Sequence, residues 1–463
     1  MNMDIYDCIS PLDFRYYGQD EALQKLLGPY LTERARYLSE ARVEAAAAAA
    51  LAKQNVCSLQ AAAEIARAAE EITPDEIAAE DARIQHDTRA LVNCLQARVS
   101  DAAKPFVHLS LTSFDVKDTA TAYRFKRCCK EAILPEMLKL EQALIELARR
   151  EKDTLQMGRT HGQHAVPITF GFAMAEYVSR FGNRIEAVRA AGANLRGKIS
   201  GAVGAYNASS LFSADPMQFE RDVLAELDLE PATHSTQIVE AEYVVDFMHA
   251  IVSAFGVLAN LADDMRNLQR TEVGEVGEAF GKDQVGSSTM PHKRNPWNFE
   301  NVKSQWKLAM SRMTAVYADQ ISEHQRDLTN SASQRFLPEI LVLFVSAVRR
   351  MARIMGKLVT DKERMLANFS LTSGLVAAEP AYILLAAYGH PNAHEALRVL
   401  TLEAQQTKRP LGELLAEAED LRPYLAKLTP AQSALLQDPS LYTGIAARKA
   451  EVVCDGWERR LGL

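Results

Sequence analysis

Cysteine is scarce in this chain, and its scarcity limits the kind of fold that the sequence can form. Six of the 463 residues are cysteine, namely Cys8, Cys57, Cys94, Cys128, Cys129 and Cys454. They are scattered, two of them are adjacent, and none has the spacing of a zinc ligand set, so the sequence indicates neither a disulfide framework nor a metal site. We therefore expect a protein of a reducing compartment, the cytoplasm.

Basic clusters and long apolar runs are also absent. The 60 acidic residues outnumber the 52 lysines and arginines, which gives a net charge of −8, and no basic block stands out. This balance argues against a general role on nucleic acid or on a membrane surface. No apolar stretch approaches about 20 residues, which argues against membrane spans. The segment from Met1 to Arg15 lacks the basic start and apolar core of a secretory signal.

Helical periodicity, by contrast, is abundant. Apolar residues recur every three or four positions at Met174, Val178, Phe181, Ile185 and Val188. A second stripe lasts about seven helical turns. Its members are Val244, Phe247, Ile251, Phe255, Leu258, Leu261, Met265 and Leu268. Helices of this length bury a stripe against several neighbours, so the sequence predicts an elongated helical bundle in the middle of the chain.

The length predicts about three domains, all of them helical. We place an N-terminal domain at residues 1–107, which ends near a break at Lys104-Pro105, and the long-helix bundle at residues 108–358. Glycine and proline punctuate shorter helical pieces in a C-terminal domain at residues 359–463. Strand signals are sparse, and the best of them is a glycine-rich stretch at residues 201–206 that predicts a small hairpin. The expected fold class is all-α.

A polar loop at residues 281–296 interrupts the periodic region. Asn295 followed by Pro296 predicts the N-cap and the first turn of the next helix. The N–H groups at that helix start, together with the charges of Lys293 and Arg294, predict an anion site. The alternative is an ordinary interhelical loop whose basic residues are solvated.

Two further polar islands contain candidate functional residues. One includes His161 and His164, which are candidate proton donors because histidine titrates near neutrality. A hydrogen-bonded structural role is the alternative for each. The other, at residues 108–115, has Thr112 followed three positions later by Asp115, which is nearly a capping box, and capping alone would explain it.

A polar block near residue 330 is a further candidate. Arg326, Ser331 and Arg335 are suited to clamp a carboxylate or a phosphate, and a solvated helix surface is the alternative. Residues 85–87 and 10–16, taken alone, are loop and cap positions.

Together, the islands resemble the conserved regions of the fumarase/aspartase superfamily. The loop Gly-Ser-Ser-Thr-Met-Pro-His-Lys-Arg-Asn-Pro at residues 286–296 is similar to its signature, and residues 108–118 and 157–167 are similar to its other two regions. Within the superfamily the chain most resembles the adenylosuccinate lyase family. The residues that carry this closer similarity are 10–16, 86–87, 235–237 and 326–335.

The resemblance implies a fold, an assembly and a reaction. The subunit would be a three-domain, all-helical chain whose central helices form the core of a homotetramer, with each active site drawing residues from three subunits. The implied reaction is a β-elimination that releases fumarate from adenylosuccinate, and from succinylaminoimidazole-carboxamide ribotide, in purine biosynthesis. It implies no metal and no cofactor.

By resemblance, Ser287 is the base and His161 is the general acid. The base removes a proton from a succinyl carbon, and the acid protonates the departing nitrogen. Serine is a weak base in water, so the loop must close and exclude solvent. Lys293, Asn295 and the following helix start would stabilise the carboxylate charge that grows in the transition state.

The resemblance also assigns substrate contacts. Thr112, Ser113 and Ser288 would lie near the succinyl carboxylates, with Gln237 and Asn301 as further contacts. Arg15, Tyr16, Arg326, Ser331 and Arg335 would bind the nucleotide and its phosphate. Gln85, His86, Asp87 and His108 would line the same site, and Glu300 would orient a histidine or Lys293.

Some positions depart from the family pattern, and other readings share the signature. His164 stands where many relatives carry proline, and Asn301 where some carry arginine, which affects fine substrate contacts rather than the elimination. Another superfamily lyase, a carboxymuconate-type cycloisomerase and an inactive structural homologue are the alternatives. Convergence of Arg15, Arg326 and Arg335 on one end of a pocket would favour a nucleotide substrate, whereas their scatter would favour a small dicarboxylic acid.

Overall fold

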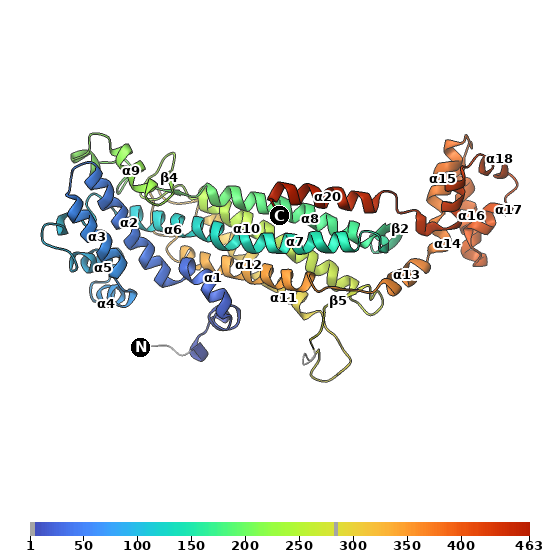
Figure 1. The fold of residues 1–463 in the computed structure, drawn as a ribbon, viewed down its shortest axis with the longest axis horizontal. Helices are drawn as coiled ribbons and strands as arrows, with labels where there is room; N and C mark the ends of the chain where they lie inside the picture. Colours follow the sequence, from blue (N-terminus) through green and yellow to red (C-terminus); the bar gives the residue numbers. More distant parts are fainter. Residues whose placement is uncertain (1–4, 282–285) are drawn as a thin grey trace. The chain divides into compact units, whose positions relative to one another are not determined.

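The computed structural model describes residues 5–281 and 286–463, and it confirms the all-α fold class. The helices are α1 (Glu21–Leu31), α2 (Glu33–Lys53), α3 (Leu59–Glu71), α4 (Pro74–Ile84), α5 (Asp87–Gln96), α6 (Ser113–Cys128), α7 (Leu134–Arg150), α8 (Phe170–Ala193), α9 (Pro216–Ala225), α10 (Glu242–Leu268), α11 (Trp297–Ala318), α12 (Ser333–Met355), α13 (Lys362–Ser370), α14 (Ser373–Val376), α15 (Ala378–Ala387), α16 (Ala393–Thr407), α17 (Leu411–Glu417), α18 (Arg422–Leu425), α19 (Pro430–Gln437) and α20 (Ala446–Leu461) (Figure 1). The strands are β1 (Leu155–Thr160), β2 (Gln163–Thr169), β3 (Arg196–Gly197), β4 (Glu230–Pro231), β5 (Val276–Gly277) and β6 (Val359–Thr360).

Short 3-10 and π turns fill some connections. They are η1 (Ile5–Asp7), η2 (Leu12–Tyr16), η3 (Lys104–Phe106), η4 (Cys129–Ile133), η5 (Ser209–Leu211) and η6 (Pro439–Leu441). The break predicted at Lys104-Pro105 corresponds to η3, which separates α5 from α6.

The chain divides into two compact units. The first comprises Met1–Met137, Asn183–Leu258 and Ser304–Arg349, and the second comprises Leu138–Gly182, Ala259–Lys303 and Arg350–Leu463. The helices α7, α8, α10, α11 and α12 therefore contribute residues to both units. The division into three domains at residues 107 and 358 stays a prediction.

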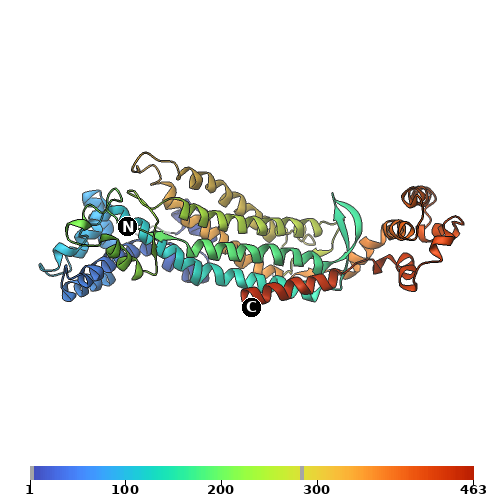
Figure 2. The same ribbon diagram turned by 90° about the horizontal axis from the view of Figure 1, so that it is seen from above.

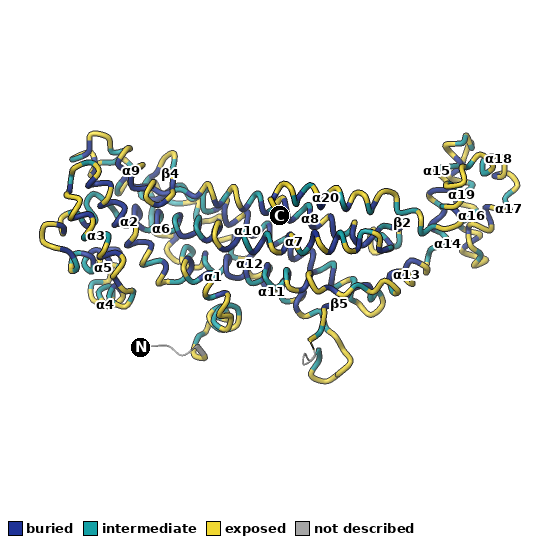
Figure 3. Tube along the Cα trace, viewed as in Figure 1, coloured by how far each residue is buried: buried dark blue, intermediate teal, exposed yellow. Residues whose placement is uncertain are grey.

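The predicted apolar stripes form buried helix faces. In α10, Phe247, Ile251 and Phe255 are fully buried in the first unit, and Leu261 and Met265 are fully buried in the second (Figure 3). Burial of each such side chain contributes about 1.5–3 kcal/mol to folding. This stabilisation explains why the sequence forms helices of this length.

The expectation that no stretch is long and apolar enough to span a membrane is wrong for helix α10. Among the described residues, α10 is the only single helix that is long and apolar enough to cross a membrane. However, 67% of its most apolar 18-residue stretch is buried inside the protein. The bent pair Lys362–Ser370 and Ser373–Ala387 passes the same test only when its two pieces are taken together. The burial of α10 is that of a core helix.

In the first unit, a buried ion pair fixes the start of α6. The Asp115 carboxylate and the Lys198 ammonium are both 0% exposed and are in contact. Asp115 also accepts the N–H groups of Thr112 at 2.8 Å and of Ser200 and Gly201 at 3.1 Å. These bonds supply the partners that a buried charge requires. The predicted capping relation between Thr112 and Asp115 is thus present.

The prediction of a hairpin at residues 201–206 is wrong. Those residues form turns because Gly201 and Gly204 have φ of +84° and +80°, and Gly201 wraps around the Asp115 carboxylate. A Cβ on Gly204 would lie 2.0 Å from the Ser235 carbonyl oxygen, so only glycine fits there.

The main hairpin lies in the second unit instead. Strands β1 and β2 pair antiparallel, with Thr160 opposite Gln163, and extend as a ribbon beyond the helices (Figure 2). The two residues between them, His161 and Gly162, have φ of +54° and +74°. Positive φ at both central positions is the signature of a type I′ turn, whose twist matches that of the strands.

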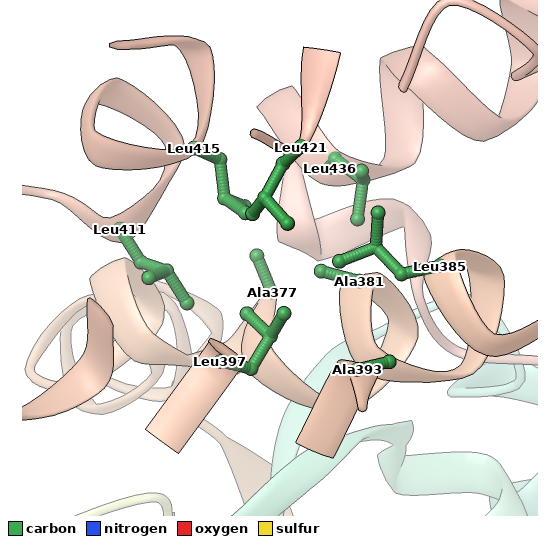
Figure 4. Packing of buried hydrophobic residues seen from close by; sticks show 9 residues of the cluster. All are labelled: Ala377, Ala381, Leu385, Ala393, Leu397, Leu411, Leu415, Leu421 and Leu436. Carbon is green, nitrogen blue, oxygen red and sulfur yellow. The ribbon is translucent and has the colours of Figure 1, made fainter. Parts of the chain in front are cut away.

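The C-terminal part of the second unit has its own small core, as its short punctuated helices predict. Leucine and alanine side chains from α15, α16, α17 and α19 and from the segments next to α14 and α18 converge there (Figure 4). The cluster consists of Ala377, Ala381, Leu385, Ala393, Leu397, Leu411, Leu415, Leu421 and Leu436.

Candidate active site

The predicted acid, His161, lies exposed at the tip of the β1–β2 hairpin, and a buried carboxylate holds the base of that hairpin. Glu275 is 0% exposed and forms an ion pair with Arg159 at 2.5 Å. It also accepts the amide groups of Gln156 at 2.8 Å and Asn368 at 2.9 Å. These contacts fix β1 on both sides of its irregular pairing, so the His161 ring projects from a rigid support.

His164 has a structural role. Its Nδ1 lies 2.8 Å from Thr372 Oγ1. Burial, and then the charge of Arg159, lower the pKa of His164 below its ordinary value, so the ring is neutral near pH 7. A neutral imidazole bonded to a hydroxyl is a poor proton donor to substrate, which leaves His161 as the acid candidate of this island.

In the described part of the signature loop, residues at its two ends contact each other. The Asn295 side chain donates to the Gly286 carbonyl at 3.0 Å, and a Cβ on Gly286 would lie 2.2 Å from the Lys293 carbonyl oxygen. Glycine is therefore required at this close approach. The predicted loop members at residues 282–285 lie outside the described residues.

Within this loop, backbone amides surround the predicted base. Ser287 Oγ accepts the N–H groups of Thr289 at 3.3 Å and Met290 at 3.1 Å, and its side chain is half-buried. Donors aimed at an oxygen stabilise its anionic form. Ser288 is exposed with its Oγ 3.4 Å from Thr289 Oγ1, and Lys293 is exposed.

The prediction of an anion site at the start of the helix after the loop, α11, is wrong. Helix α11 begins at Trp297 rather than at Pro296, and the N–H groups of Asn298 and Phe299 donate to Glu278 Oε1 at 3.0 and 3.2 Å. Asn298 Nδ2 also donates to Glu278 Oε2 at 2.6 Å. The 6% exposed Glu278 carboxylate thus caps the helix instead of Asn295, and the helix start already holds an anion. Glu300 and Asn301 follow in its first turns.

In the first unit, a cavity of about 950 Å³ gathers many of the predicted binding residues. Its lining includes Gln85, His86, Asp87, Ser113, Gln237, Ser331 and Arg335. They come from the α4–α5 junction, from the start of α6, from the turn before α10 and from the start of α12. Segments distant in sequence therefore converge on one hollow, which a helix-surface role for each would not require.

The α4–α5 junction shows how the sequence shapes this wall. Gln85 ends α4 with φ of +57°, and His86 caps α5 by accepting the Arg89 N–H on Nδ1 at 3.2 Å. An Nδ1 that accepts leaves the proton on Nε2, so the ring is able to donate from Nε2.

Asp87 has a partner that the sequence did not indicate. Lys117 of α6 donates to its Oδ1 at 2.7 Å. Burial raises the pKa of Asp87, but the hydrogen bond and charge of Lys117 outweigh it, and the pKa lies below its ordinary value. Lys117 lines the same cavity. Lys117 follows Ser113 by four residues in α6, which places both side chains on one helix face. This spacing is the sequence signal that could have identified Lys117 as a cavity residue.

His108 lies outside the cavity lining and pairs with a buried acid. Its Nδ1 is 2.6 Å from Glu44 Oε1. Burial disfavours the imidazolium, but the Glu44 carboxylate outweighs burial, so the pKa of His108 lies above its ordinary value. Neighbouring Thr112, at the start of α6, is half-buried.

The predicted phosphate-binding arginines do not all converge. Arg335 lines the cavity and donates to the Ser331 carbonyl. Arg326 donates instead to the carbonyls of Asp319 at 2.8 Å and Gln320 at 3.5 Å, at the end of α11. Arg15 is exposed and Tyr16 is half-buried in η2, and their neighbours Leu12, Asp13 and Tyr17 line the cavity.

The acid and base candidates have no described contact with each other. Among the described residues no hydrogen bond joins His161 to Ser287, and the hairpin and the loop that follows β5 leave their unit at separate places (Figure 1). Within the described ranges there is also no group of three or more His, Cys, Asp or Glu side chains arranged to hold a metal ion.

Comparison with family models identifies two matches that together span most of the chain. Residues 11–309 match a model described as Lyase, and residues 322–433 match a model described as Adenylosuccinate lyase C-terminal.

Comparison with individual proteins agrees. The chain is 35% identical to an adenylosuccinate lyase of Pyrococcus abyssi, over 90% of this chain and 92% of that protein. It is 30% identical to the N-acetyl-S-(2-succino)cysteine lyase of Enterococcus italicus, over 92% and 93% of the two chains. Among solved structures, the 3-carboxy-cis,cis-muconate lactonizing enzyme of Pseudomonas putida matches with a TM-score of 0.82 and 26% identity, over 98% of this chain and 100% of that one.

Proposed function

The chain belongs to the adenylosuccinate lyase family, and we propose that it releases fumarate from adenylosuccinate and from succinylaminoimidazole-carboxamide ribotide in purine biosynthesis. The observation that carries this proposal is the cavity in which Asp87, Ser113, Gln237 and Arg335 meet, together with Gln85, His86 and Ser331. Hydroxyl, amide, imidazole and guanidinium groups around one hollow suit a substrate that bears carboxylates, ribose hydroxyls and a phosphate. Arg15, Arg326 and Arg335 do not converge within one subunit, so the preference for a nucleotide over a small dicarboxylic acid rests on the adenylosuccinate lyase matches.

In the proposed mechanism, Ser287 Oγ takes a proton from the succinyl carbon next to a carboxylate. The electron pair left on carbon delocalises into that carboxylate and then forms the double bond of fumarate as the C–N bond breaks. His161 delivers a proton to the departing nitrogen. The amides of Thr289 and Met290 stabilise the serine alkoxide.

Side chains, rather than the start of α11, would stabilise the developing carboxylate charge. The amides of that helix start are bonded to Glu278, so Lys293 and Asn295 would supply the stabilising groups, with Thr112, Ser113 and Ser288 near the succinyl carboxylates. Asn301 is a further substrate contact in this proposal, and Glu300 orients the acid or Lys293.

The proposal includes a homotetramer in which different subunits supply the base and the acid. The exposure of His161, and the separate places at which its hairpin and the signature loop leave the second unit, support this arrangement (Figure 1). We further propose a cytoplasmic enzyme with three domains per subunit that uses no metal or cofactor and acts away from membranes and nucleic acid.

The decisive experiment follows fumarate release by the purified protein. We expect turnover of adenylosuccinate, and a loss of turnover by orders of magnitude in Ser287→Ala with the oligomeric state unchanged, because the change removes a proton-transfer group and little buried surface. The matched control is Ser210→Ala, an exposed serine of the first unit. Turnover of N-acetyl-S-(2-succino)cysteine without turnover of adenylosuccinate would overturn the proposal.

A further inference from the structure

A short turn at residues 235–239 carries Gln237 to the wall of the large cavity. Ser235 and Val239 pair as an antiparallel bridge, and the Thr236 N–H donates to the Ile238 carbonyl at 3.1 Å. Ile238 and Val239 are buried. The side chain of Gln237 therefore reaches the cavity only while the backbone of this turn keeps its place.

Three anchors hold the turn from outside. Asp118 Oδ2 accepts the Val239 N–H at 2.9 Å, the Gln325 carbonyl accepts the Gln237 N–H at 3.3 Å, and Ser200 Oγ lies 2.7 Å from Ser235 Oγ. Of these anchors, only Asp118 carries a charge. A carboxylate forms a shorter and stronger bond to an amide than a neutral acceptor does, so Asp118 is the strongest of the three.

The turn has room to move if this anchor is lost. A second, smaller cavity of about 50 Å³ lies against the turn and is lined by Asp118, Ile238, Val239 and Asn330 among others. Close packing normally prevents a backbone segment from shifting, and this space relaxes that restraint.

Asp118 also belongs to a helix, α6, that lines the large cavity. Ser113, Lys117 and Thr121 of α6 line the large cavity, and Asp118 is on the same helix. The same helix therefore determines the position of Ser113 directly and the position of Gln237 through the bond to Val239.

The charges that face Asp118 come from several elements. Burial raises its pKa to about 6, while the Val239 N–H, Lys198 and Arg326 oppose the shift and Asp115 adds to it. Arg196, Glu240 and Asp319 line the smaller cavity with it. Asp118 therefore changes its charge within a pH range in which the enzyme is easily assayed.

We propose that Asp118 is a positioning residue, which holds the turn at residues 235–239 so that Gln237 meets the substrate. The inference rests on the proposed function, because it takes Gln237 as a substrate contact.

The first test separates KM from kcat. We expect Asp118→Ala to raise the KM for adenylosuccinate about tenfold, as loss of one charge-assisted bond predicts, with little change in kcat. Asp118→Asn keeps a neutral acceptor for the Val239 N–H but lacks the charge, so its KM should lie between those of the parent and Asp118→Ala. The control is Asp222→Ala, which removes a buried carboxylate of the same unit that lines neither cavity. An equal loss of kcat and kcat/KM in Asp118→Ala would overturn the proposal.

A double-mutant cycle tests whether Asp118 acts through Gln237. Once Gln237→Ala is present, adding Asp118→Ala should raise KM little further. Additive effects would overturn the inference and leave the proposed function intact. If Gln237→Ala alone leaves KM unchanged, the assignment of Gln237 as a substrate contact fails, and the inference fails with it.

The pH profile keeps the proposal testable if Asp118→Ala does not fold. In the parent enzyme KM should rise as the pH falls through about 6, because protonation removes the charge of the anchor. The ratio of the parent KM to the Asp118→Asn KM isolates this effect from titration of the substrate phosphate. A ratio that stays constant from pH 5 to pH 8 would contradict the proposal.

Discussion

His108 and Glu44 form a charged pair whose contribution to stability depends on pH. The pKa of His108 is raised in the folded protein, so the folded state binds the proton more tightly than the unfolded chain does. The stabilisation is therefore fully present below about pH 6.5, the ordinary value, and is lost as the pH rises through the higher folded-state pKa.

We predict that His108→Gln removes this dependence. The free energy of unfolding of the parent should exceed that of the variant most at pH 5.5, and the difference should shrink steadily toward pH 9. Urea denaturation across that range measures it. The control is His234→Gln, an exposed histidine of the same unit. A difference that grows with pH would contradict the assignment of the charged pair.

At this scale, motifs predict which residues belong to the site but not where their side chains point. The spacing around Arg326 indicates a clamp, yet its guanidinium donates to two carbonyls at the end of α11. The pairing of Asp87 with Lys117 joins positions 30 residues apart. Sequence periodicity assigns a residue to a helix face, but a partner on another element follows only from the packed structure.

At the scale of elements, long helices were predictable and their ends were not. The stripe in α10 predicts its burial because apolar residues with a 3.6-residue period form one apolar face of a helix, and that face packs against the core. The start of α11 depends on Glu278, which lies 20 residues before Asn298 and is outside any local capping pattern. The β1–β2 hairpin has a weak sequence signal because its turn is His-Gly, whereas residues 201–206 have more glycine but use it to surround Asp115.

We predict that Glu278→Ala destabilises the protein by about 1–3 kcal/mol, because it leaves the amides of Asn298 and Phe299 without their acceptor. The measurement is urea denaturation followed by circular dichroism. Glu278→Gln keeps one acceptor oxygen and should lose less. Glu272→Ala, an exposed glutamate in the preceding loop, is the control. Equal losses for Glu278→Ala and Glu272→Ala would show that the cap contributes nothing.

At the scale of the whole molecule, the motifs predict the family, and the matches over most of the chain confirm it. Composition alone leads no further than a helical protein, because many folds share the same balance of apolar and charged residues. The assembly rests on the separation of the acid from the base.

We predict that two inactive variants complement each other. Ser287→Ala lacks the base, and His161→Asn lacks the acid but keeps a residue that tolerates the positive φ of the hairpin turn. If two protomers supply these groups to one site, random exchange of subunits should restore about a quarter of the parental activity. The measurement is fumarate release after mild dissociation and reassembly, with exchange verified by mass.

Each variant treated alone in the same way is the control. Complete absence of recovery after verified exchange would mean that one protomer supplies both groups.

The contact between Asp115 and Lys198 has a consequence for how the chain is made. Its two members are 83 residues apart, so the first turn of α6 emerges from the ribosome well before the ammonium that neutralises it. At the usual pace of translation this interval is roughly 4 to 17 s. During that time a nascent subunit carries an incomplete wall of its future binding site, and chaperones have an opportunity to engage it.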